Sequence, residues 1–154
     1  MQVSFDTNLR LKLRPLERAR AITHAAMRDC DIALPGLEDA VHLTGLDEPD
    51  AIADFYLNLG AGTVALTLGR AGTLVATAQR REQISVREVA AVDATAAGDT
   101  FDGAFLAELL EGRDPFAAAR YANAAAALST LGFGAVAPMP SRAQELAFLE
   151  AWSG

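Results

Sequence analysis

The chain has 154 residues, of which 13 are basic and 20 acidic, so its formal net charge is −7. Hydrophobic residues make up 51% of the sequence, enough for one domain with its own core over residues 1–154. The acidic balance argues against nucleic acid or an anionic membrane as the main partner, because both require a basic face.

Strands and helices are expected in alternation along the chain. Short β-branched or apolar runs predict strands at 3–5, 31–34, 63–68, 73–77 and 83–86. Periodic apolar positions predict helices at 15–28, 37–44, 49–59, 99–111 and 115–131. Asp114 and Pro115 form a cap and a first-turn proline for the last of these helices. This alternation predicts an α/β sheet covered on both faces.

Cysteine content and the N-terminal segment favour a cytoplasmic protein. The single cysteine, Cys30, cannot form an internal disulfide, which is typical of a reducing compartment. The first residues lack the long apolar region of a signal peptide, and no stretch approaches the ~18 apolar residues of a membrane span.

The segment D-A-T-A-A-G-D-T-F at residues 93–101 is the sharpest local signal for chemistry. Its small residues leave backbone N–H groups bare at the start of a helix, where an anion is favoured. The carboxylate of Asp99 would lie beside these amides and could accept a proton from an alcohol. Amide donors and a base together suit phosphoryl transfer. The alternative is an aspartate that only caps the helix, and local spacing leaves both open.

Three segments together resemble the ribokinase-like (PfkB) sugar kinases. Residues 93–101 are similar to that family's D-T-x-G-A-G-D-x-F signature, and residues 67–72 to its T-L-G-x-x-G turn. Residues 122–135 resemble its C-terminal nucleotide-pocket segment. Within the family the likeness is greatest to 2-keto-3-deoxygluconate kinases, whose F-D-x-N-x-R segment resembles residues 5–10. The resemblance implies a three-layer α/β/α sandwich and the C-terminal, nucleotide-binding half of a kinase, with the lid and N-terminal strands absent.

The resemblance also implies a role for each matching residue. Asp99 corresponds to the catalytic base. Arg10 corresponds to an arginine between the acceptor and the phosphates, and its planar fork suits a carboxylate or phosphate. The other implied sites are the anion hole (Ala96, Ala97, Gly98), the nucleotide contacts (Thr67, Gly69, Gly72, Asn123), a monovalent-cation site near Asp93 and a metal-assisting acid at Asp39.

Several of these expectations depend on local conformation. Asp6, Asn8 and Arg10 would point to one side if the chain stays extended after the first strand. The alternative for Arg10 is a surface arginine in a basic run. Ala96 replaces the family's commoner glycine, and its Cβ requires a negative φ. Of the family's N-x-x-E motif, only Asp39 matches the acid.

The resemblance implies ATP-dependent phosphorylation of the primary hydroxyl of 2-keto-3-deoxygluconate, with Mg²⁺ and, as a further ion, K⁺. The expected partners are a small-molecule sugar acid and ATP, and a homo-oligomer is an open alternative. Two other functions stay open: a fructokinase- or ribokinase-type sugar kinase, and a truncated, non-catalytic nucleotide-binding module.

Overall fold

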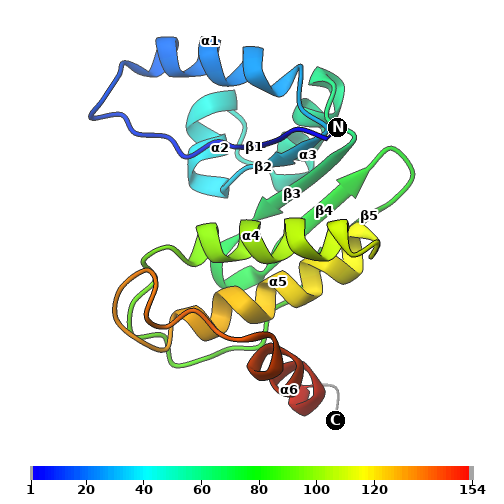
Figure 1. The fold of residues 1–154 in the computed structure, drawn as a ribbon. Coiled ribbons are helices and arrows are strands. Elements are labelled where there is room, and N and C mark those ends of the chain that lie inside the picture. The colour runs from blue at the N-terminus through cyan, green and yellow to red at the C-terminus, as the bar shows by residue number, and fades with distance from the viewer. Residues whose placement is uncertain (1, 153–154) are drawn as a thin grey trace. The chain divides into compact units, whose positions relative to one another are not determined.

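The computed structural model describes residues 2–152, which form a mixed α/β structure (Figure 1). Its five-stranded sheet has the order β1-β2-β3-β4-β5. The first three strands run parallel, with Asp6 beside Leu34, and β3 and β4 are antiparallel. The strands are β1 (Ser4–Asp6), β2 (Ile32–Leu34), β3 (Thr63–Thr67), β4 (Thr73–Thr77) and β5 (Arg81–Ile84).

Within residues 2–152, six α-helices and one short 3₁₀ turn lie between and after the strands. The helices are α1 (Leu16–Met27), α2 (Leu37–Thr44), α3 (Pro49–Leu59), α4 (Ala97–Leu110), α5 (Pro115–Ser129) and α6 (Arg142–Trp152), and the 3₁₀ turn η1 covers Gly69–Ala71. Within residues 2–152 no helix is long and apolar enough to cross a membrane.

The chain divides into two compact units. The first contains the residues up to 69 together with 73–83, and the second contains residues 70–72 and 84 onward. The expected single domain over residues 1–154 remains a prediction.

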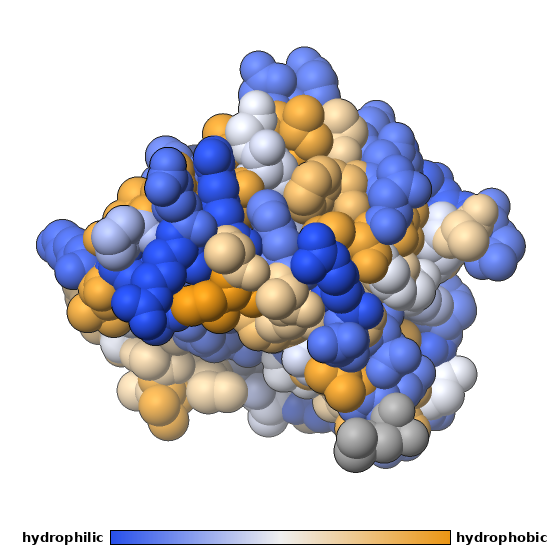
Figure 2. Space-filling model, turned by 90° about the horizontal axis from the view of Figure 1, so that it is seen from above, coloured by the Kyte–Doolittle hydropathy of each residue, from blue (hydrophilic) through white to orange (hydrophobic). Residues whose placement is uncertain are grey.

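The core of the first unit lies between its sheet and its helices. Tyr56 and Ile52 of α3 and Val64 and Leu66 of β3 are fully buried there. Around this core the surface is mixed: seen from above, strongly hydrophilic residues alternate with hydrophobic ones (Figure 2). Burial of these apolar side chains is what orders the three parallel strands.

In the second unit, α4 and α5 pack side by side (Figure 1). Alanines of α5 are buried, and Phe101 and Phe105 of α4 stack with ring centroids 5.7 Å apart. Glu108, 1% exposed, pairs with Arg113 at 2.6 Å and with Arg142 at 2.5 Å. Arg142 also lies over the ring of Tyr121 and so ties α6 to the helix pair.

Most of the predicted elements are confirmed. The helices at 37–44 and 49–59 have the predicted bounds. The fifth strand covers 81–84 instead of 83–86, because the hairpin turn closes earlier, where Thr77 N–H donates to the carbonyl of Arg80. The helix predicted at 99–111 begins at Ala97.

Candidate functional site

The amino-terminal turn of α4 starts from an alanine in the left-handed region. Ala96 has φ 59°, and its carbonyl accepts hydrogen bonds from Thr100 N and Thr100 Oγ1, both at 2.9 Å. The expected negative φ of Ala96 is therefore wrong. This left-handed residue redirects the chain from the loop into the helix. The conformation costs about 1–2 kcal/mol, which the two hydrogen bonds from Thr100 help to offset.

Two backbone amides of this turn are left for a ligand. The amide of Ala97 donates to the carbonyl of Ala94 at 3.2 Å. Gly98 and Asp99 are the second and third helical residues, so no helical carbonyl lies four residues before them. A Cβ built on Gly98 meets nothing within 4 Å outside the helix's own backbone, so the space on the Cβ side of this residue is open. Of the expected anion-hole amides, that of Ala97 thus has a backbone acceptor, and the amide of Asp99 joins that of Gly98 as a candidate donor. The anion hole itself remains a prediction.

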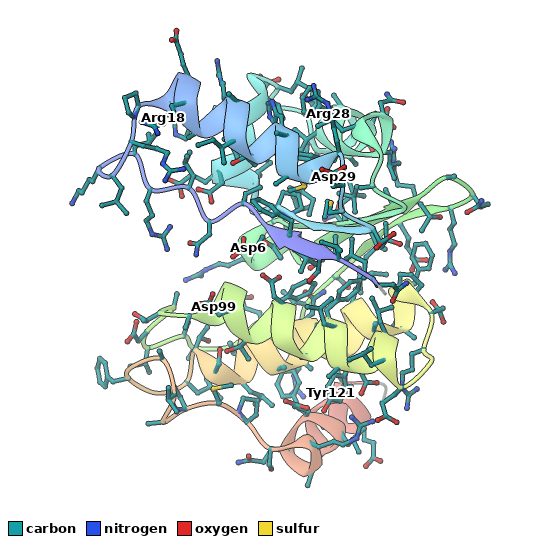
Figure 3. All side chains as sticks on the ribbon, turned by 45° about the horizontal axis from the view of Figure 1, so that its top comes forward. Asp6, Arg18, Arg28, Asp29, Asp99 and Tyr121 are labelled. Atoms are coloured by element: carbon teal, nitrogen blue, oxygen red, sulfur yellow. The ribbon has the colours of Figure 1, made fainter. Side chains whose placement is uncertain are left out.

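Asp99 lies at the amino-terminal end of α4 with an exposed side chain (Figure 3). The residue at the N-cap position is Ala96, and no side chain caps the helix. The interpretation of Asp99 as a mere N-cap is therefore wrong. Its carboxylate and its own amide lie on the same turn, which also favours a negative group through the helix dipole.

Asp93 holds the loop before α4 in place. One of its carboxylate oxygens accepts from Thr95 N at 2.9 Å and Thr95 Oγ1 at 2.7 Å. The other accepts from the amide of Gly134 at 2.9 Å. The Gly134 amide, followed by the two Thr95 donors, lowers the pKa of Asp93 below its usual value. This carboxylate stays ionised and links the loop to the segment after α5.

In the second unit, two predicted nucleotide residues also support the backbone. Asn123 is buried and its Nδ2 donates to the carbonyl of Ile84 at 3.0 Å. Gly72 has φ +91°, and a Cβ there would lie 2.0 Å from the same carbonyl oxygen. Only glycine fits this close approach. Asn123 and Gly72 therefore both contact Ile84.

In the first unit, Thr67 is the last residue of β3, and Gly69 lies two residues further along the chain. The amide of Thr67 donates to the carbonyl of Pro35 at 3.0 Å. Gly69 is exposed, has φ +59° and begins η1. A Cβ on Gly69 would meet nothing within 4 Å, so its surroundings leave room for a ligand.

Arg10 belongs to a tight turn and not to an extended segment. The strand ends at Asp6, whose Oδ1 accepts from the amide of Asn8 at 3.1 Å, and Asn8 has φ 33°. The condition under which Asp6, Asn8 and Arg10 would point to one side, an extended chain after the first strand, is therefore not met, because this Asx turn breaks the alternation. Arg10 is exposed and its Nη1 donates to the carbonyl of Leu9 at 3.0 Å.

Asp39 lies in the first turn of α2, where its Oδ2 accepts from the amide of Leu9 at 2.7 Å and from Thr7 Oγ1 at 3.3 Å. In the described part of the chain, no group of three or more His, Cys, Asp or Glu residues could hold a metal ion. The expected metal role of Asp39 remains a prediction.

Besides Asn123 and Gly72, which meet at Ile84, the structure brings predicted residues together in two further local sets. Asp93 and the residues from Ala96 to Asp99 share one loop and helix start, while Arg10 and Asp39 meet through Leu9. Sequence reasoning missed Thr7, Gly134 and the amide of Asp99. The last could have been found by counting from the helix start, whereas the contacts of Thr7 and Gly134 span 32 and 41 residues.

Residues 1–142 match the model of the pfkB family carbohydrate kinases. The chain belongs to this family. It is 35% identical over 154 residues to a ribokinase of Haemophilus influenzae, with 97% of this chain and 50% of that protein covered. It is 32% identical over 151 residues to a 2-dehydro-3-deoxygluconokinase of Bacillus subtilis, with 97% and 47% covered.

The fold is also similar to that of a solved fructokinase. A fructokinase from Vibrio cholerae O395, in its fructose-, ADP- and calcium-bound form, superposes with a TM-score of 0.89 at 31% identity. The match covers 96% of this chain and 50% of that one. The expected ribokinase-like α/β fold is thereby confirmed. The chain spans about half the length of the curated relatives it matches.

Proposed function

We propose that the protein transfers the terminal phosphoryl group of ATP to the primary hydroxyl of 2-keto-3-deoxygluconate. The observation that carries this proposal is the start of α4. There, backbone amides without a helical acceptor share one turn with the carboxylate of Asp99, which is exposed and does not cap the helix. Amide donors at a helix start bind a phosphoryl group, and a neighbouring carboxylate takes the proton of the attacking alcohol. Kinases depend on this combination of positioning and charge stabilisation.

In this proposal each group at the helix start has one task. The carboxylate of Asp99 accepts the hydroxyl proton as the new oxygen–phosphorus bond forms and ADP leaves. The amides of Gly98 and Asp99 donate to the oxygens of the phosphoryl group in transfer. ATP would supply that group, and Mg²⁺ bound to ATP would neutralise part of the charge of its phosphates. The ionised carboxylate of Asp93 holds the loop in its observed conformation. If K⁺ binds beside this loop, Asp93 would be one of the ligands of the ion.

Thr67, Gly69, Gly72 and Asn123 are proposed to form the nucleotide site. Gly69 supports this role, because a Cβ there would meet nothing within 4 Å and a backbone without one lets a ligand approach closely. Buried Asn123 would fix residues 84 and 85, whose carbonyls accept from its Nδ2. With ATP as donor we expect the protein in the cytoplasm. Self-association stays an open alternative.

The choice of a sugar acid as acceptor rests on Arg10. Its guanidinium is exposed and can bind a carboxylate through two parallel hydrogen bonds, which a neutral sugar cannot offer. The identity to a 2-dehydro-3-deoxygluconokinase supports the same choice. The ribokinase relative, at comparable identity, makes ribose the competing acceptor.

An acceptor panel tests the proposal. The purified protein is incubated with ATP, Mg²⁺ and, in turn, 2-keto-3-deoxygluconate, ribose and fructose, and ADP formation gives kcat/KM for each. We expect the sugar acid to be preferred, and Arg10→Ala to lower its kcat/KM while changing the values for neutral sugars little. Preference for ribose or fructose would overturn the choice of acceptor. Nucleotide binding without any transfer would support the non-catalytic module instead.

A further inference from the structure

The turn that carries Arg10 is fixed at both ends. On one side, Asp6 accepts from the amide of Asn8, which adopts a left-handed conformation uncommon for residues with a Cβ. On the other side, the carbonyl of Arg10 accepts from the amide of Leu13 at 2.9 Å. A short segment in such a conformation persists only where surrounding contacts hold it.

The contact that holds the middle of this turn comes from another element. Asp39, 30 residues away on α2, accepts from the amide of Leu9 at 2.7 Å through Oδ2. The same oxygen accepts from the hydroxyl of buried Thr7 at 3.3 Å. Hydrogen bonds to an ionised carboxylate are about twice as strong as neutral ones. One carboxylate oxygen therefore anchors both residues that flank Asn8.

We propose that Asp39 is a positioning residue that presents Arg10 to the anionic group of the substrate. This inference rests on the proposed function, in which Arg10 binds a carboxylate or phosphate. Asp39 fixes the amide of Leu9, and the carbonyl of Leu9 in turn accepts from the guanidinium of Arg10 at 3.0 Å. The backbone of Leu9 thus connects the carboxylate of Asp39 to the guanidinium of Arg10 through two hydrogen bonds. Because the turn is preformed, Arg10 loses less freedom when the anion binds.

The hydrogen bonds separate this role from metal binding. Asparagine at position 39 keeps a carbonyl oxygen that can accept from Leu9 and Thr7, but it removes the negative charge. Alanine removes both. A positioning role therefore predicts that Asp39→Asn is tolerated and Asp39→Ala is not, whereas a metal-assisting role predicts that both fail. Glu38, exposed on the same helical turn, provides a matched control as Glu38→Ala.

Two measurements test the proposal. The first is amide hydrogen exchange at Leu9, which does not depend on activity. We expect exchange about tenfold faster or more in Asp39→Ala, as loss of the hydrogen bond to Leu9 implies. Asp39→Asn, which keeps a neutral acceptor, should give a clearly smaller increase, and Glu38→Ala should stay near wild type. The second is kcat/KM for the sugar acid. We expect a loss of up to about 100-fold in Asp39→Ala, mainly through KM, and no further loss when Arg10→Ala is added.

Three results would overturn the inference. Leu9 exchange unchanged in Asp39→Ala would mean that the carboxylate does not hold the turn. Equal losses of kcat/KM in Asp39→Asn and Asp39→Ala would assign the effect to charge. Additive losses from Asp39→Ala and Arg10→Ala would mean that the two residues act independently. If the wild-type protein transfers no phosphoryl group, the proposed function fails on its own, and Leu9 exchange still decides whether Asp39 holds the turn.

Discussion

Replacing Ala96 by glycine should stabilise the protein, although glycine at the next position should destabilise it. Ala96 has φ 59°, a left-handed conformation that costs an L-residue about 1–2 kcal/mol. Glycine removes this strain but loses about 0.5–1 kcal/mol of additional backbone entropy on folding. The expected net gain is therefore about 0.5–1 kcal/mol. For a chain of this size it corresponds to a rise in Tm of roughly 1–4 °C.

The matched control is Ala97→Gly. Ala97 is the first residue of α4, where glycine relieves no strain and costs about 0.5–1 kcal/mol. Thermal unfolding followed by circular dichroism should thus give shifts of opposite sign for two identical substitutions one residue apart. A lower Tm for Ala96→Gly, or the same shift for both variants, would refute the left-handed start of α4.

Three further predictions follow from the glycines and from His24. Gly72→Ala forces a Cβ to within 2.0 Å of the Ile84 carbonyl oxygen and should cost roughly 3 kcal/mol in denaturant unfolding, whereas Gly69→Ala, with nothing within 4 Å, should cost only about 1 kcal/mol. Equal costs would contradict the close approach at Gly72. The Gly98→Ala variant should be as stable as wild type or more so, because the new Cβ enters open space on a helix. The same methyl group should lower kcat by crowding the bound phosphoryl group. An unchanged kcat would show that Gly98 does not belong to the anion site. The pKa of His24 lies below 6.5, mainly because the side chain is partly buried and also because Arg20 and Arg28 are nearby. The unfolded state therefore binds more protons than the folded state between these two pKa values. The free energy of unfolding should fall as the pH drops through 6.5 toward the lowered value. His24→Phe should flatten this dependence in urea titrations across the pH range, and an unchanged slope would assign it to other groups.

Local signals explain why much of the fold could be predicted. The helix at 49–59 has a proline at its first position and Gly60 after its end, and the structure uses both residues that way. Asp114 was expected to cap α5, and its carboxylate accepts from the amides of Phe116 and Ala117. Each of these features is decided by residues within one helical turn.

The errors at β5 and at α4 come from local backbone geometry that the apolar pattern does not reveal. Thr77 Oγ1 accepts from the amides of Gln79 and Arg80, so the hairpin turn ends at Arg80 and β5 begins at Arg81, two residues earlier than predicted. The helix start at Ala97 was missed because Ala96 enters it in a left-handed conformation without a capping side chain. Neither arrangement changes the apolar pattern from which strands and helices are predicted.

The site was predicted best where it is continuous in sequence. The loop and helix start around Asp99 could be read from small residues followed by a carboxylate. The turn of Arg10 could not, because its shape depends on Asp39, which lies 30 residues from Leu9. The link from Asp93 to Gly134 spans 41 residues and was missed for the same reason.

The central claim is that Asp99 takes the proton of the attacking hydroxyl, and the most direct test is phosphoryl transfer by Asp99→Asn. The account predicts a fall in kcat of about 10²–10⁴-fold, with ATP affinity within a few-fold of wild type. Glu111→Gln, an exposed carboxylate at the other end of α4, should keep wild-type kcat. Wild-type turnover in Asp99→Asn would contradict the account.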